Sequence, residues 1–204
     1  MNTATIRSIV GATASTQINP KTTALIAIDI QNEYFNGQLP IPDGLTVLRN
    51  TNRLISMADQ HGMPVFHIQH ITPVGSPIFA ENSATAAIHP EVQRSAQHSV
   101  IAKGAPSAFA GTALHQQLQA RGITTLIISG LMTHNCIAAT VFDGAGLGYQ
   151  NIVADDACAT RDLPTADGSV INHKVLHQAV IAGLSDVAAE IRSTNDILEL
   201  SLES

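Results

Sequence analysis

The apolar residues of this chain fall into short, nearly continuous runs that alternate with longer stretches of helical spacing. Residues 22–30 (TTALIAIDI) form one such run, which is rich in β-branched residues and too short for a buried helix. The run predicts a strand that is covered on both faces. Five further strands are predicted at residues 64–70, 99–103, 124–129, 151–154 and 187–192.

Helices are predicted between these strands. From Gly44 to His61 the apolar residues recur at helical spacing, and Gly62 stands where the end of a helix favours a left-handed residue. Strand and helix therefore alternate, which predicts an α/β fold of three layers: a parallel sheet of about six strands with helices on both faces. The other helices are predicted at residues 112–121, 133–148, 167–182 and 195–202.

One irregular segment interrupts this alternation. Residues 71–98 connect two predicted strands and are longer than a typical loop, so we expect them to shape a binding site or an oligomer contact. A chain of 204 residues is most simply one domain. We expect residues 1–20 to form an N-terminal arm and residues 21–204 a single domain.

Composition narrows the possible partners. The chain has ten Lys and Arg against sixteen Asp and Glu, a formal charge of −6, and the basic residues are scattered. This balance argues against nucleic acid and anionic membranes as partners and favours a small-molecule substrate. Only two cysteines occur, without metal-type spacing, and no apolar run has the length of a secretory signal or a membrane span. A cytoplasmic protein is therefore expected.

Three reactive residue types lie at or just beyond the ends of predicted strands. Asp29 ends the first strand, Lys103 ends the third, and Cys136 follows the fourth, where the chain turns into a helix. Because the carboxyl ends of parallel strands face one crevice, we expect these residues to meet. Each also has a structural interpretation: the aspartate as a turn residue, the lysine as a solvated strand end and the cysteine as a small core residue.

The chemical interpretation makes Cys136 a nucleophile. A helix N-terminus and the Lys103 ammonium would both favour thiolate over thiol, and Asp29 could take the thiol proton and return it to a departing amine. The backbone amides of Met132 and Cys136 could hold the developing oxyanion. The residues taken alone leave the structural and the chemical interpretations both open.

Three longer motifs carry a family resemblance. ALIAIDIQNEYF surrounds Asp29, VIAKGAPSAFAGTAL surrounds Lys103, and SGLMTHNCIAATVFDGAGLGYQNIVADDACAT surrounds Cys136. In this order and spacing they resemble the isochorismatase-like, or cysteine hydrolase, family. The resemblance implies a doubly wound six-stranded parallel sheet in the order 3-2-1-4-5-6, an Asp-Lys-Cys triad and a non-proline cis peptide at Leu131–Met132. It also implies a homodimer or homotetramer.

The chain departs from one branch of that family. Nicotinamidases bind a metal through an Asp-x-His near the end of the second strand and another histidine, whereas this chain reads FHIQHITP there. His67 and His70 are present without the aspartate. We therefore expect an enzyme with no metal and no cofactor, in which His70 either lines the pocket or hydrogen-bonds within the core.

The resemblance and the retained cysteine favour a hydrolase of small amide or carbamoyl substrates that works through a thioester. The alternatives are an isochorismatase-type vinyl-ether hydrolase that does not need Cys136, a metal-dependent nicotinamidase, and a catalytically silent oligomeric scaffold. Cys158 is interpreted as structural. For Phe109, and for Phe79 in the long segment, the alternative is that they pack against the sheet. The candidate pocket residues are Gln31, Tyr34, Phe35, His70, Phe109 and His134.

Overall fold

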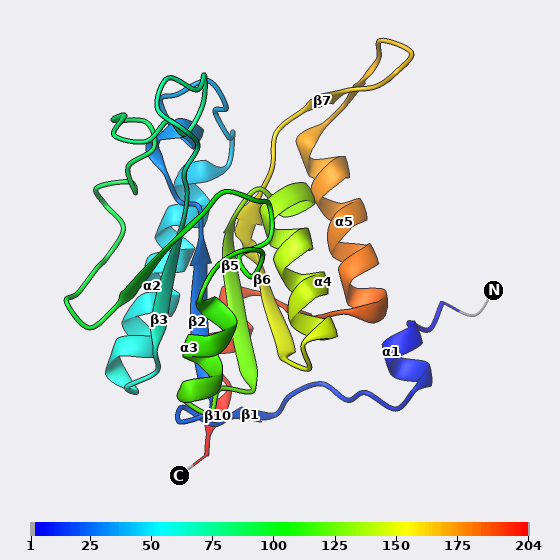
Figure 1. The fold of residues 1–204 in the computed structure, drawn as a ribbon. Helices are drawn as coiled ribbons and strands as arrows, with labels where there is room; N and C mark the ends of the chain where they lie inside the picture. Colours follow the sequence, from blue (N-terminus) through cyan, green and yellow to red (C-terminus); the bar gives the residue numbers. More distant parts are fainter. Residues whose placement is uncertain (1–2, 204) are drawn as a thin grey trace.

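The computed structural model describes residues 3–203, and its centre is a six-stranded parallel sheet (Figure 1). Parallel pairing joins every neighbouring pair of strands. Counted along the chain, their order is 3-2-1-4-5-6, so the predicted fold class and strand order are confirmed. In spatial order the strands are β4 (Ser99–Lys103), β3 (Val65–His70), β2 (Thr23–Ile28), β5 (Thr125–Leu131), β6 (Gln150–Ala159) and β9 (Glu190–Arg192).

Helices cover both faces of this sheet. One face carries α2 (Gly44–Gln60) and α6 (Thr194–Leu198), and the other carries α3 (Leu114–Ala120), α4 (Ala138–Gly146) and α5 (His173–Val187). The residues of β2 alternate between two cores, with Leu25 facing α2 and Ile26 facing the other helices. All six residues of β2 are buried, as its apolar run predicts.

The described part of the N-terminal arm runs along the amino edge of the sheet. The short helix α1 (Ile6–Ile9) lies against α5, and the Ile6 amide donates to Asp186 at 2.8 Å. Strand β1 (Gln17–Ile18) pairs with β10 (Ser201–Leu202). The division at residue 20 stays a prediction. Among residues 3–203, no helix is long and apolar enough to cross a membrane.

Two helix predictions are wrong in the C-terminal part of the chain. The helix expected at 167–182 is α5, which begins only at His173, because β7 (Leu163–Pro164) and β8 (Val170–Ile171) form a hairpin before it. This hairpin projects from the molecule above α5 (Figure 1). The helix expected at 195–202 ends at Leu198, since the last residues pair with β1.

Candidate active site

Three strand ends bring Asp29, Lys103 and Cys136 together at the carboxyl edge of the sheet. The Lys103 Nζ lies 2.8 Å from Asp29 Oδ2 and 3.2 Å from Cys136 Sγ. The side chains of Asp29 and Lys103 are 0% exposed, and Cys136 is 2% exposed. The expectation that strand geometry gathers these residues is therefore confirmed. A buried ion pair beside a buried thiol is costly to desolvate, which is typical of functional rather than structural positions.

The backbone turns Asp29 into this edge. The strand hydrogen bonds end with the Asp29 amide, which donates to Ile68 O at 3.0 Å, and the residue then adopts φ of 52°. This left-handed conformation is uncommon for a residue other than glycine, although aspartate tolerates it better than most. Local strain of this kind clusters at active sites, where surrounding structure enforces it.

The Lys103 ammonium has four acceptors around it. Besides Asp29 and Cys136, these are His70 Nδ1 at 2.9 Å and Ala105 O at 3.1 Å. Because an ammonium donates only three hydrogens, the four groups compete for them. Burial and the Lys103 charge lower the pKa of His70 to about 4. His70 is therefore neutral at pH 7, accepts at Nδ1 and carries its hydrogen on Nε2.

Cys136 lies in a π-helical turn, η2 (Thr133–Ile137), between β5 and α4. Burial raises the pKa of the Cys136 thiol to about 12, and the Asp29 charge adds to this rise while the Lys103 charge opposes it. The expected lowering of this pKa is therefore wrong for the free site, because desolvation outweighs the ammonium. Burial likewise raises the pKa of Asp29. The ligand-free site holds a protonated thiol at neutral pH.

The raised thiol pKa predicts a loss of stability at high pH. The unfolded chain releases the Cys136 proton near its ordinary pKa of 9.0, whereas the folded chain holds it to about pH 12. The contribution of this thiol to the free energy of unfolding should therefore be constant below pH 9 and fall above it, by about 1.4 kcal/mol per pH unit. Urea unfolding at pH 8 and pH 10 measures the fall, and Cys136→Ala should reduce it. An equal fall in both proteins would contradict the raised pKa.

The turn before Cys136 requires Gly130 and contains the expected cis peptide. Gly130 has φ of +126°, and a Cβ there would lie 2.0 Å from Ile28 O on the neighbouring strand. The Leu131–Met132 bond is cis, as the sequence motif predicts. The assignment of the Met132 and Cys136 amides to an oxyanion hole stays a prediction.

Two of the candidate pocket residues, Tyr34 and His70, lie beside this cluster together with Phe79. The rings of Tyr34 and Phe79 are 5.3 Å apart, and those of His70 and Phe79 are 5.1 Å apart. Burial, with the charges of Asp29 and Cys136, raises the pKa of Tyr34. Phe79 comes from the long segment 71–98, which also pairs with Gln31 through Ile88. That segment therefore shapes the site, as expected.

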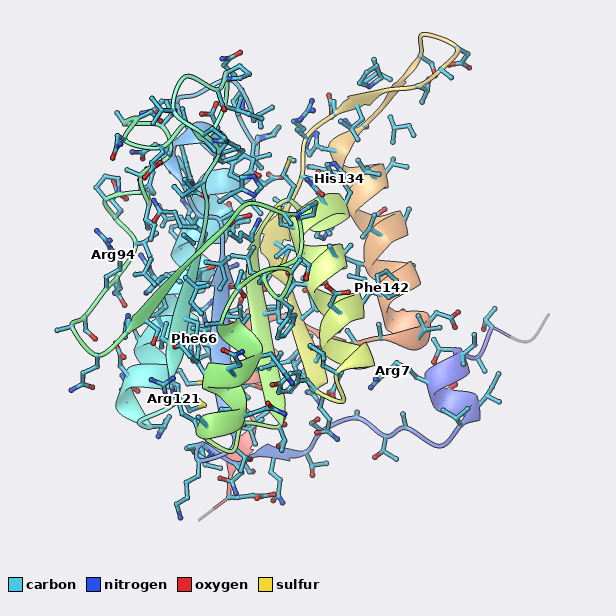
Figure 2. All side chains as sticks on the ribbon, viewed as in Figure 1. Arg7, Phe66, Arg94, Arg121, His134 and Phe142 are labelled. Atoms are coloured by element: carbon cyan, nitrogen blue, oxygen red, sulfur yellow. The ribbon has the colours of Figure 1, made fainter. Side chains whose placement is uncertain are left out.

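His134 lies at the same edge, at the upper end of α4 in Figure 2. Its Nδ1 hydrogen-bonds the Thr160 hydroxyl, and burial lowers its pKa, followed by the charge of Arg161. The sequence interpretation missed Arg161, whose buried Nε has no hydrogen-bond partner in the described residues. Its position two residues after β6, at the carboxyl edge, is the signal that points to it.

Gln31 and Phe109 are placed differently from the prediction, and the position of Phe35 leaves its pocket role a prediction. Gln31 is fully buried, and its side chain donates to His70 O and Ala86 O and accepts from the His70 amide, so it holds backbone rather than lining a pocket. Phe109 stacks on Tyr149 at the amino end of β6 and packs against the core that contains α4, away from the carboxyl edge of the sheet. Phe35 packs on His89, with ring centroids 4.3 Å apart.

The fold is that of an α/β cysteine hydrolase, and Asp29, Lys103 and Cys136 meet at the carboxyl edge of its sheet. Residues 23–196 match the family model of the isochorismatase domain, and the chain therefore belongs to the isochorismatase family.

Relatives match over most of the chain. The isochorismatase family protein YddQ of Bacillus subtilis (strain 168) is 37% identical over 180 residues, which cover 87% of this chain and 99% of that protein. The ureidoacrylate amidohydrolase RutB of Acinetobacter baylyi is 29% identical, covering 70% of this chain and 72% of that protein. The crystal structure of an isochorismatase from Pseudomonas putida KT2440 has a TM-score of 0.89 at 31% identity and covers 96% of this chain and 99% of its own.

Proposed function

We propose that this protein hydrolyses a small amide or carbamoyl substrate through a thioester on Cys136, with Asp29 and Lys103 completing a triad. The observation that carries the proposal is the contact of the Lys103 ammonium with both Asp29 and Cys136 inside a buried site. A thiol, a carboxylate and an ammonium in contact supply a nucleophile, a base and a fixed positive charge.

Asp29 is the base in the first half of this reaction. The carboxylate takes the thiol proton as Cys136 Sγ attacks the carbonyl carbon, and the Lys103 ammonium stabilises the thiolate that forms. Because burial raises the pKa of the thiol, a base must take its proton for the attack to occur. Asp29 then gives the proton to the departing amine. The backbone amides of Met132 and Cys136 hold the oxyanion.

Water completes the reaction. Asp29 takes a proton from a water molecule that attacks the thioester carbon. The carbon–sulfur bond breaks, and Asp29 returns the proton to the leaving Cys136 thiolate, which restores both groups. His70 carries its hydrogen on Nε2 and can donate it to an acceptor on the substrate. With Tyr34 and Phe79, it forms one aromatic side of the site. These features support a small, flat substrate with a carbonyl group, and the relation to RutB supports an amide.

We also propose a homo-oligomer of this chain in the cytoplasm. Exposed apolar side chains on α5 and its neighbours support this assembly: Val175 is 60% exposed, Val170 in the projecting hairpin 65% and Phe142 on α4 51%. Figure 2 labels Phe142 where α4 runs beside α5. The two cysteines are both free, which fits a reducing compartment.

The proposal predicts the effect of removing the base. Asp29→Asn keeps the shape of the side chain but cannot take the thiol proton, so kcat on an amide should fall by about 10²- to 10⁴-fold. Steady-state kinetics measure the loss, and circular dichroism checks that the variant is folded. Retention of more than a tenth of the parent kcat would exclude Asp29 as the base.

A vinyl-ether hydrolase is the second candidate function. The raised pKa of Asp29 favours it, because a protonated carboxyl could protonate a vinyl-ether carbon directly. A screen of small primary amides, carbamoyl compounds and isochorismate separates the two. Ammonia release from members of the first two groups supports the amidase, whereas turnover of isochorismate alone contradicts it.

A further inference from the structure

The four acceptors around the Lys103 ammonium are also ligands for a metal ion. They are a carboxylate oxygen, an imidazole nitrogen, a thiol sulfur and a backbone carbonyl oxygen, at 2.8 to 3.2 Å from Nζ. A lysine cation thus occupies the centre of a mixed O, N, S site. In residues 3–203, Asp29, His70 and Cys136 are the one group of three such side chains whose ligand atoms all lie within 4.8 Å of one another.

The surroundings hold His70 in place and leave the oxygens of Asp29 without hydrogen bonds. Gln31 donates to His70 O at 2.8 Å and accepts from the His70 amide at 2.8 Å, which fixes the backbone that carries the imidazole. Both carboxylate oxygens of Asp29 are buried, and neither makes a hydrogen bond within residues 3–203, although Oδ2 lies 2.8 Å from the Lys103 ammonium. An unused buried acceptor is an available metal ligand.

We propose that Zn²⁺, or another thiophilic divalent cation, binds this cage in competition with the Lys103 ammonium and thereby blocks Cys136. Sulfur and imidazole ligands select zinc over the hard cation Mg²⁺, which takes oxygen ligands. Zinc forms bonds to Cys136 Sγ, His70 Nδ1 and a carboxylate oxygen of Asp29. The thiol proton goes to solvent, and the ammonium moves out of the cage with its own protons.

The geometry explains why this site inhibits rather than serves as a resident cofactor site. Zinc bonds of about 2.0–2.3 Å are shorter than the present distances to Nζ, so the ligands must move inward by somewhat less than about 1 Å. The ammonium must also leave a buried position. Both requirements weaken zinc binding in the parent protein, and removal of the ammonium should strengthen it.

The test measures Zn²⁺ affinity by titration calorimetry in the parent protein, in Lys103→Met and in Lys103→Met with His70→Gln. Lys103→Met should bind zinc at least about tenfold more tightly than the parent, because no ammonium competes for the same ligands. Adding His70→Gln should weaken binding by about tenfold or more, as expected for loss of a metal ligand. Adding His134→Gln instead, which removes a neighbouring histidine outside the cage, should leave the affinity of Lys103→Met unchanged.

A second measurement uses the parent protein alone and does not depend on activity. Zn²⁺ should slow the labelling of Cys136 by iodoacetamide, as read from the mass of its peptide, and Mg²⁺ should not. Equal effects of the two cations, or no protection by zinc, would overturn the proposal. So would a Lys103→Met protein that is folded by its thermal melt and binds zinc no more tightly than the parent.

Discussion

Cys136→Ala is expected to reduce amide hydrolysis by at least about 10⁴-fold, since the proposed reaction has no other nucleophile. The substitution removes one sulfur atom from a buried position and leaves the Asp29–Lys103 ion pair without its thiol neighbour. Steady-state kinetics on an amide found in the screen measure the loss. Residual turnover within about tenfold of the parent would exclude a thioester mechanism and favour vinyl-ether chemistry.

Cys158→Ala is the matched control for this experiment. Cys158 is the other buried thiol and lies on β6 opposite Gly130. Within residues 3–203 it makes no hydrogen bond with the Lys103 ammonium. Its loss should change stability but leave the chemistry intact. An equal loss of activity in both variants would indicate damage to the fold rather than removal of a nucleophile.

The second large effect is expected at Gly130. Its φ of +126° is accessible to glycine and to almost no other residue, and a Cβ would lie 2.0 Å from Ile28 O and 2.7 Å from Ile28 N. An alanine there must force β5 away from β2 at Ile28, the residue directly before Asp29. Gly130→Ala should therefore destabilise the protein by about 4 kcal/mol or more. Urea unfolding measures the change in the free energy of unfolding.

Gly146→Ala supplies the contrast. Gly146 lies in α4 and is exposed, and a Cβ at this position would have no neighbouring atom within 4 Å, so alanine meets no obstacle there. Because alanine favours helix over glycine, this variant should be neutral or more stable by up to about 1 kcal/mol. If both glycine variants unfolded alike, the argument from the contact of β5 with β2 would fail.

Local patterns are sufficient to predict most of the fold. The buried run at residues 22–30 and the helical spacing from Gly44 to His61 each specify their own element, because one face or both must be buried. One of the errors at the C-terminal end concerns an element that local patterns do not specify. Strand β10 exists because it pairs with β1, more than 180 residues earlier, and two residues carry no periodicity of their own. The predicted start of α5 is too early. Two local signals mark the true start: residues 167–168 form the hairpin turn, and Asn172 caps the helix.

The candidate site also has features that the sequence predicts and features that it does not. The rule that parallel strands end at one edge is sufficient to bring Asp29, Lys103 and Cys136 together. Their pKa values could not be predicted, since desolvation depends on how completely the surrounding segments cover the site. Contacts with backbone atoms could not be predicted from residue types either. Lys103 donates to the Ala105 carbonyl, and the Gln31 side chain donates to the carbonyls of His70 and Ala86.

The most direct test of the thioester is the mass of the protein during turnover. The substrate is an activated ester that carries the acyl group of an amide the protein hydrolyses. It should acylate Cys136 faster than water removes the acyl group, so an adduct accumulates. We predict a mass increase equal to one acyl group, located on the peptide that contains Cys136 and absent from Cys136→Ala. Hydrolysis of the ester by the folded parent protein with no adduct on that peptide would contradict the proposed function.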